Sequence, residues 1–313
     1  MKTHSRRQFI NQTSQVAALA ILTPASLFKS LAKEAGFTVN IFSKHLHWLS
    51  YEDMAARVIE MGFDGVDLTV RPGGHVEPER VKTDLPKAVE ILRKANIQVE
   101  TITTAIESVD SPFAEDIVKT VSQLGIQYYR MGWIPYNAKY TIEKNLKTIT
   151  FQFKEVADMN RQYKIKGAYQ NHAGKSFGAS IWDMWIVFKE IDSKYIGSQY
   201  DLRHAMVEGL HAWESGFDLI APFINSLTVK DFHFKNQPDG ESVENVPLGK
   251  GIVKWNAFFK KLKEKNITVP ISLHCEYPLG GADQGKQTLT IAEQEVLSAL
   301  KRDLMILRKY VES

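Results

Sequence analysis

From Phe37 onward, short apolar runs rich in Val, Ile and Thr alternate with longer amphipathic stretches, eight times in succession. The runs have the length and composition of buried parallel strands, and the stretches between them have the spacing of amphipathic helices. We expect strands at 37–42, 65–69, 97–104, 126–132, 165–170, 196–201, 225–230 and 269–276. We expect helices near 51–61, 84–95, 113–124, 139–160, 180–192, 212–220, 254–265 and 287–310.

Eight strand–helix units without a Pro- or Ser-rich linker predict a single domain over residues 37–313, an α/β fold of the (β/α)8 TIM-barrel type. The rival fold is a doubly wound open sheet, which would usually carry a glycine-rich phosphate loop after its first strand. This chain has Ser43-Lys44-His45-Leu46-His47-Trp48 at that place. The barrel is therefore the preferred interpretation.

Residues 1–32 have the features of an export signal. Arg6-Arg7 is followed by an apolar stretch from Val16 to Leu22, and small residues follow at 30–32. The paired arginines before Phe9-Ile10 resemble the twin-arginine signal, which the export machinery reads. The apolar stretch is too short to span a bilayer. We therefore expect an exported protein, in a bacterial periplasm, without stable membrane insertion.

The charge of the remaining chain argues against some classes of partner. Four of the 39 Lys and Arg residues lie in the first 32 positions, which hold none of the 36 Asp and Glu residues, so the rest of the chain has a net charge of −1. A net charge of −1 does not favour binding of this part of the chain to the negatively charged backbone of a nucleic acid. The one cysteine, Cys275, excludes an intramolecular disulfide and a multi-cysteine zinc site.

Polar residues gather where the expected strands end, and in a TIM barrel these ends form the catalytic mouth. Seven of the nine histidines follow strands: His45, His47, His75, His172, His204, His233 and His274. Asp201 and Glu276 each end an apolar strand, where a carboxylate is costly unless it is paired or metal-bound. These groups suit a divalent cation such as Mn²⁺, Mg²⁺ or Zn²⁺, and they also suit proton transfer beside a carbonyl.

The body also resembles the sugar phosphate isomerase/epimerase superfamily, the xylose-isomerase-like barrels. The motifs that carry the resemblance are Gly62-Phe63-Asp64-Gly65-Val66-Asp67, Gln170-Asn171-His172, Asp201-Leu202-Arg203-His204, Val229-Lys230-Asp231, Leu248-Gly249-Lys250-Gly251 and Glu276. Members typically bind one divalent metal through Glu, Asp, His and Glu from strands 5 to 8. They isomerise or epimerise sugars by moving a proton beside a carbonyl.

Carried over position by position, the resemblance implies a metal site at Gln170, Asp201, Thr228 and Glu276. Two positions depart from the family pattern, because Gln170 stands for a glutamate and Thr228 for a histidine. A glutamine oxygen is able to coordinate a hard cation, but glutamine brings no charge and cannot act as a base.

The resemblance also implies the catalytic roles. Glu276 is expected to be the base; we further expect Lys230 or a histidine to stabilise the enolate oxygen, with His204 as the catalytic histidine. With one matched carboxylate base, we expect aldose–ketose isomerisation or β-elimination from an oxidised sugar ahead of two-base epimerisation. The candidates for the substrate cleft are His45, His47, Arg71, His75, Arg130, Trp133, His172 and His233. Aromatic rings stack on sugar faces and arginine binds carboxylate or phosphate, so the expected substrate is a small carbohydrate, either free, oxidised or glycosidic.

Three alternatives to an exported isomerase are considered. The first is a non-catalytic sugar-binding barrel with a degenerate metal site, which Gln170 and Thr228 favour. The second is a lyase or epimerase that acts on oxidised (keto) glycosides. The third, an apurinic-site endonuclease on the same barrel, is disfavoured by the net charge of −1 and by the export signal.

Overall fold

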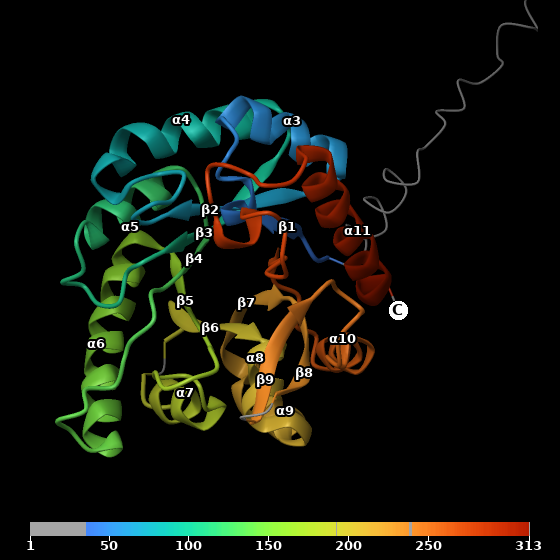
Figure 1. Cartoon of the computed structure of the whole chain (residues 1–313). Coiled ribbons are helices and arrows are strands. Elements are labelled where there is room, and N and C mark those ends of the chain that lie inside the picture. The colour runs from blue at the N-terminus through green and yellow to red at the C-terminus, as the bar shows by residue number, and fades with distance from the viewer. Residues whose placement is uncertain (1–35, 192, 238–239, 313) are drawn as a thin grey trace, which may run out of the picture.

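The fold is a closed barrel of eight parallel strands surrounded by helices, as a computed structural model shows (Figure 1). The structure describes residues 36–191, 193–237 and 240–312. In barrel order the strands are β1 (Val39–Phe42), β10 (Ile271–Leu273), β7 (Ile224–Val229), β6 (Ile196–Asp201), β5 (Lys166–Gln170), β4 (Tyr128–Arg130), β3 (Gln98–Thr104) and β2 (Gly65–Val70). The barrel closes because β1 pairs with both β10 and β2. The predicted single TIM barrel is confirmed.

Helices follow the strands and cover the outside of the barrel. They are α3 (Tyr51–Met61), α4 (Val81–Lys94), α5 (Ala114–Gln123), α6 (Ile142–Tyr163), α7 (Ile181–Phe188), α8 (Leu202–Gly209), α9 (Trp213–Ile220), α10 (Trp255–Glu264) and α11 (Glu293–Glu312). Short 3₁₀ helices lie at η1 (Ser43–Leu46), η2 (Pro78–Arg80), η3 (Leu210–Ala212), η4 (Ala221–Phe223) and η5 (Ala282–Gln284). The apolar core lies between these helices and the strands, and it buries side chains such as Val58, Leu85, Val118, Phe153 and Leu300.

Local sequence signals explain where the helices begin and end. The Ser50 hydroxyl accepts a hydrogen bond from the Asp53 N–H at the start of α3, and Gly62 ends this helix with a φ of 93°. Thr141 caps α6 through the Lys144 N–H. A side-chain oxygen satisfies an N–H that the first helical turn leaves free, and glycine adopts a positive φ at little cost.

The structure adds one unit that the sequence analysis did not expect. Between β7 and α10, strands β8 (Asp231–Gln237) and β9 (Gly240–Val246) form an antiparallel hairpin outside the barrel sheet. The hairpin touches the barrel at α8, where Arg203 Nη2 donates to Asn245 Oδ1 at 2.6 Å. The alternation of Phe232 and Phe234 with polar residues was a sequence signal for such a strand.

The interior of the barrel is unusually polar. Ser272 of β10 donates to Asp67 Oδ2 of β2 at 2.6 Å, although β1 lies between these strands, so both side chains face inward. Thr103 of β3 donates to the same carboxylate at 3.0 Å. TIM barrels usually fill this space with branched apolar side chains. Here a hydrogen-bonded polar group lies directly beneath the mouth instead.

The expected export signal, residues 1–32, lies outside the described residues. Within the part of the chain that the structure describes, no helix has the length and apolar character needed to cross a bilayer.

Candidate functional site

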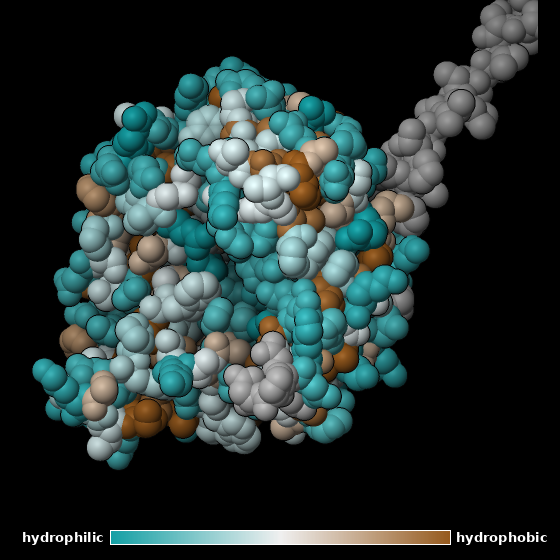
Figure 2. Space-filling model, in the orientation of Figure 1, coloured by the Kyte–Doolittle hydropathy of each residue, from teal (hydrophilic) through white to brown (hydrophobic). Residues whose placement is uncertain are grey.

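Asp201 and Glu276 lie together at the C-terminal mouth of the barrel, joined by one lysine. Asp201 ends β6, Lys230 directly follows β7, and Glu276 lies three residues beyond β10. Lys230 Nζ is 2.9 Å from Glu276 Oε2 and 3.5 Å from Asp201 Oδ2. The side chains of Asp201 and Lys230 are almost fully buried, and that of Glu276 is 21% exposed. In the space-filling view, hydrophilic residues surround a recess near the centre of the molecule (Figure 2).

A second lysine holds the other oxygen of Glu276. Lys44 Nζ, in η1, lies 2.9 Å from Glu276 Oε1. Burial by itself would raise the pKa of Glu276, but Lys230, the His274 ring, whose Nδ1 is 3.6 Å from Oε1, and Lys44 together hold the pKa well below its usual value. Glu276 is therefore an ionised carboxylate between two ammonium groups.

The two carboxylate oxygens of Asp201 accept hydrogen bonds from different elements. Its Oδ1 accepts the His204 N–H at 3.1 Å and so caps α8, while its Oδ2 accepts a hydrogen bond from Gln170 Nε2 at 2.9 Å. The Asp201 backbone N–H donates to Asn171 Oδ1 at 2.7 Å, and its carbonyl accepts from Asn171 Nδ2 at 2.8 Å. These contacts fix the orientation of the carboxylate at the mouth.

The orientation of the Gln170 amide follows from its neighbours. Arg130 Nη1 donates to Gln170 Oε1 at 3.0 Å, so the oxygen is engaged by a cation. The amide nitrogen therefore points toward Asp201 Oδ2 and toward Thr228 Oγ1, which is 3.4 Å away. An arginine has only donors and a carboxylate only acceptors, so the opposite orientation would place like groups against each other.

This donor set does not fit the divalent cation that the family resemblance implies. Gln170 presents an N–H to the centre, Thr228 offers only a hydroxyl, and the ammonium of Lys230 bridges the remaining two positions, Asp201 and Glu276. Among the described residues, no group of three or more His, Cys, Asp and Glu could hold a metal ion. A dication would have to enter beside Lys230, Lys44 and Arg130, where like-charge repulsion opposes it.

Adding Mn²⁺, Mg²⁺ or Zn²⁺ to chelator-treated protein is therefore expected to produce no stoichiometric binding. The measurement is isothermal titration calorimetry, with metal analysis of the purified protein beside it. One equivalent of tightly bound metal would show that Lys230 moves aside, and would contradict this expectation.

His204 has a ring N–H available to donate at the mouth, but it has no free lone pair with which to act as a base. Its Nδ1 accepts from the Ala173 N–H at 3.1 Å and faces Arg203 Nη1 at 3.0 Å, so the lone pair of Nδ1 is used. The proton therefore sits on Nε2, which is 3.7 Å from Asp201 Oδ2 and has no hydrogen-bond partner. Burial and the charge of Lys230 lower the pKa of His204 well below its usual value, so the ring is neutral.

An aromatic wall extends outward from His204. The ring centroids of His172 and His204 are 4.0 Å apart, and those of Trp133 and His172 are 4.5 Å apart. The Arg130 guanidinium lies 4.7 Å from the Trp133 ring centroid. Three expected substrate-binding residues, Arg130, Trp133 and His172, therefore share one side of the mouth, and Trp133 is 39% exposed.

The opposite side of the mouth is built on Phe42, the last residue of β1. The His274 ring stacks on Phe42 with centroids 4.1 Å apart, and the Arg71 guanidinium lies 5.6 Å from the Phe42 centroid. His274 Nε2 is 3.2 Å from Ser272 Oγ, which links the mouth to the polar interior around Asp67.

The other expected histidines lie away from this group. His45 is fully buried, its Nδ1 faces the Ala282 carbonyl at 3.1 Å and its Nε2 accepts the Cys275 N–H at 2.9 Å. Burial and the charge of Lys44 lower the pKa of His45 to about 3. Because both nitrogens are engaged, His45 supports the loop after β10, which differs from the expected contact with substrate.

His47 and His75 form a pair of their own, with ring centroids 4.7 Å apart. They line a side cleft of about 330 Å³ together with Tyr51 and other residues of the β1 and β2 loops. His233 lies on the hairpin, where its Nε2 is 3.1 Å from Glu244 Oε2. None of these three histidines has a hydrogen bond or ion pair with Asp201, Lys230 or Glu276 among the described contacts.

Asp231 also acts away from the centre, although it follows Lys230 directly. Its carboxylate accepts the backbone N–H groups of Phe232, Gly249, Gly251 and Val253 at 2.9 to 3.2 Å. A Cβ added at Gly251 would come within 2.1 Å of Asp231 Oδ1, so this close approach requires glycine. The Lys-Asp and Gly-Lys-Gly motifs therefore meet to anchor the loop that returns from the hairpin.

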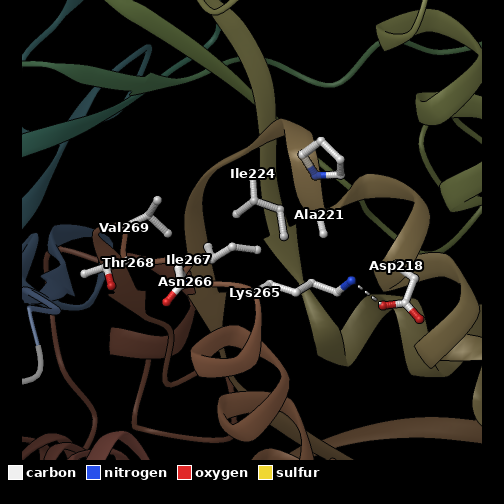
Figure 3. Close-up of a pocket in the computed structure, with 9 residues that line it drawn as sticks. Asp218, Ala221, Ile224, Lys265, Asn266, Ile267, Thr268 and Val269 are labelled. Atoms are coloured by element: carbon white, nitrogen blue, oxygen red, sulfur yellow. Dashed lines mark ion pairs between the residues drawn. The ribbon is translucent and has the colours of Figure 1, made fainter.

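Another cleft, of about 520 Å³, opens at the other end of the barrel, before β7 and β10 (Figure 3). Its charged pair is Lys265 with Asp218, at 3.0 Å, and Ile224, Ile267 and Val269 line much of the rest. TIM-barrel enzymes place their active sites at the C-terminal ends of the strands. The mouth around Glu276 is therefore the candidate site.

Comparison with known protein families gives the same barrel fold. The family model of the xylose isomerase-like TIM barrel matches residues 55–300. The chain belongs to this xylose isomerase-like TIM barrel family. No curated protein matches the chain significantly.

Solved structures with this fold have low sequence identity to the chain. D-psicose 3-epimerase from Clostridium cellulolyticum H10, with D-tagatose, has 12% identity and a TM-score of 0.67, covering 88% of this chain and 100% of its own. The 3-keto-D-glucoside 4-epimerase of E. coli has 10% identity and a TM-score of 0.63, covering 87% and 99%. A xylose isomerase-like TIM barrel protein from Mycobacterium smegmatis in complex with magnesium has 13% identity and a TM-score of 0.61, covering 84% and 88%.

Four residues at the mouth had no individual catalytic, substrate-binding or metal role in the sequence-based expectation: Lys44, Asp67, His274 and Phe42. Two sequence signals were available. Lys44 lies two residues after strand 1, next to His45, and His274 is two residues before Glu276, a spacing that places both on one face of the strand expected at 269–276. Asp67 lay within a family motif, but nothing in the sequence showed that it points into the barrel.

Proposed function

We propose that this protein is a carbohydrate isomerase-like enzyme that moves a proton on a carbon beside a sugar carbonyl. The observation that carries the proposal is the Glu276 carboxylate, placed at the barrel mouth between the ammonium groups of Lys44 and Lys230 at 2.9 Å each. A carboxylate with fixed cations beside it is suited to remove a proton while the negative charge that develops is stabilised.

In the proposed reaction Glu276 accepts the proton of the carbon next to the carbonyl. The electron pair of the broken C–H bond forms a carbon–carbon double bond, and the carbonyl electrons move to the oxygen, which gives an enolate. Lys230 Nζ and the Nε2–H of His204 are the donors that would stabilise this oxygen. The hydroxyl group on the carbon that lost its proton then passes its own proton to this oxygen, and its oxygen becomes the new carbonyl as Glu276 returns the first proton to the former carbonyl carbon, which completes an aldose–ketose isomerisation.

Gln170 bears on the type of reaction. Epimerisation with two bases needs a base on each face of the reacting carbon, and an amide whose oxygen binds Arg130 cannot serve as one. The proposal is therefore one-base chemistry, either isomerisation or β-elimination from a keto sugar, although several structural neighbours are epimerases. No step is assigned to a metal, because the donor set does not fit one.

A sugar-binding protein without catalysis is the second candidate. It is favoured by the ion pairs themselves, since two lysines neutralise Glu276 and reduce its basicity.

Proton NMR in D₂O separates the two candidates. The protein is incubated with a panel of aldoses, ketoses and keto glycosides, and incorporation of deuterium beside the carbonyl is followed. Exchange that depends on protein concentration supports the enzyme. Binding of a sugar by calorimetry without any exchange supports the sugar-binding protein.

The pH dependence of kcat/KM is expected to be flat between about pH 5 and 8, where an ordinary histidine would titrate. Burial lowers the pKa of His204 and of His274 well below the usual value, and the lysines hold the pKa of Glu276 low. All three groups therefore keep one protonation state over this range. An acid limb near neutral pH would assign the base to a group other than Glu276.

Export is a further part of the proposal and rests on residues 1–32 alone. In cell fractionation of a host with a twin-arginine pathway, the full chain is expected in the periplasm. The double substitution of Arg6 and Arg7 by lysine is expected to keep it in the cytoplasm. Equal distribution of both proteins would contradict a twin-arginine signal.

A further inference from the structure

The mouth of the barrel carries an excess of positive side chains, although the body of the chain has a net charge of −1. The basic side chains there are Lys44, Arg71, Arg130, Arg203 and Lys230, and the acidic ones are Asp67, Asp201 and Glu276, with the exposed Glu107 at the rim beside Gly132. The two lysines form ion pairs with Glu276 and Asp201. The excess charge therefore rests on the arginines.

Arg130 is a buried cation without a direct ion pair among the described residues, although the charges of Asp67 and Glu276 act on it. The residue is 3% exposed, and Nη1 donates to the neutral amide oxygen of Gln170. Its Nε is buried without a hydrogen-bond partner, and among the described residues no carboxylate lies within ion-pair distance of the guanidinium. Burial, followed by the charge of Arg71, lowers the pKa of Arg130 to about 10, so it stays protonated at neutral pH.

Arg71 is a second cation at the same mouth, on the loop after β2. Its guanidinium lies 5.6 Å from the Phe42 ring centroid and makes no ion pair or side-chain hydrogen bond within the described part of the chain. Buried charges in proteins are normally paired, because an unpaired one loses its hydration without compensation. Asp67 and Glu276 attract both guanidinium groups from a distance, but neither arginine has a direct ion pair among the described residues, so the two together offer a place for an anion from outside.

We propose that the substrate is a sugar acid, whose carboxylate binds Arg71 and Arg130. The planar guanidinium groups match a carboxylate, and Phe42 and Trp133, over which they lie, offer apolar faces to a sugar ring. This inference deepens the proposed function and rests on it, because it assumes that the sugar reacts at Glu276. Gln170 is part of the reason, since a glutamate there would supply Arg130 with the missing anion.

A phosphate on the sugar is the other oxyanion that two arginines could bind. The carboxylate is preferred because the expected export signal places the protein away from most phosphorylated sugars. The experiment includes both groups.

Calorimetric titration tests the inference without relying on turnover. The probes are D-glucuronate and D-galacturonate, the neutral amide of each, and D-glucose 6-phosphate. At least one acid is expected to bind about tenfold or more tightly than its amide, as the loss of a charged hydrogen bond implies. The preference is expected to fall as ionic strength rises.

Arg71→Gln and Arg130→Gln are expected to abolish the preference for the acid. Arg57→Gln is the matched control and should leave the preference intact, because Arg57 is a partly exposed arginine of α3 that pairs with Glu60. If the buried Arg130 variant fails to fold, the half-buried Arg71 variant still decides the question.

Equal binding of acids and amides, or no binding of either acid at millimolar concentration, would overturn the inference. If D-glucose 6-phosphate bound more tightly than both acids, the proposal that the substrate is a sugar acid would be wrong. An acid-selective protein that catalyses no proton exchange would support the inference and contradict the proposed function, so the two failures are distinguishable.

Discussion

Glu276→Gln is expected to lower kcat by about a thousandfold or more, because it removes the group that accepts the proton. Glutamine has nearly the same shape but cannot be protonated at this pH. The substitution leaves Arg71 and Arg130, the groups proposed to bind the sugar, in place, so we expect a smaller change in KM than in kcat. Deuterium exchange beside the carbonyl, followed by NMR, is the measurement.

Glu244→Gln is the control for this substitution. Glu244 lies on the hairpin and pairs with His233 and Lys235, so its loss should leave exchange within about twofold of the original protein. If the Glu276 variant exchanged deuterium at the original rate, the base would have to be another residue, and the assignment of the site would be wrong.

Lys230→Gln is expected to have the second largest effect, a fall in kcat of about a hundredfold or more, because it removes a fixed donor for the enolate oxygen. It also leaves the buried Asp201 with one cation fewer, so we expect the free energy of unfolding to fall by about 3 kcal/mol. Urea unfolding and kcat are measured on the same protein.

The pH profile gives a sharper test of Lys230. Its charge is the first of the attractive interactions that lower the pKa of Glu276. Without it, the acid limb of kcat/KM should move upward, toward the usual glutamate value of about 4.3. A variant that lost only stability would keep the original limb.

Lys44→Gln is the matched comparison for Lys230. Lys44 is as close to Glu276, at 2.9 Å, but it is more exposed and does not contact Asp201. We therefore expect its loss to cost about tenfold in kcat, with little effect on stability. If the two substitutions lowered kcat and stability equally, the position of Lys230 between Asp201 and Glu276 would give it no larger role than Lys44.

The barrel itself was predictable, because its signals are local. Alternation of apolar runs with amphipathic stretches located the eight strands, and β6 at Ile196–Asp201 has the predicted bounds. The short β10, Ile271–Leu273, was expected to be longer, because β propensity does not show where pairing with neighbours stops. The hairpin at β8 and β9 was missed because its two strands pair only with each other, outside the strand–helix alternation that located the barrel.

Local sequence signals were sufficient to predict the fold and the acids and bases that end its strands, and the family resemblance added the two departures from the ligand pattern at Gln170 and Thr228. Which of these side chains meet depends on the three-dimensional arrangement of the barrel. It brought Lys44 to Glu276 across 232 residues, turned the Gln170 amide toward Asp201, and placed His45 beneath the mouth. The hydrophobic periodicity of the sequence indicates whether a residue faces inward or outward. The contacts between side chains depend on the closure of the barrel, because closure joins strands that are far apart in the chain.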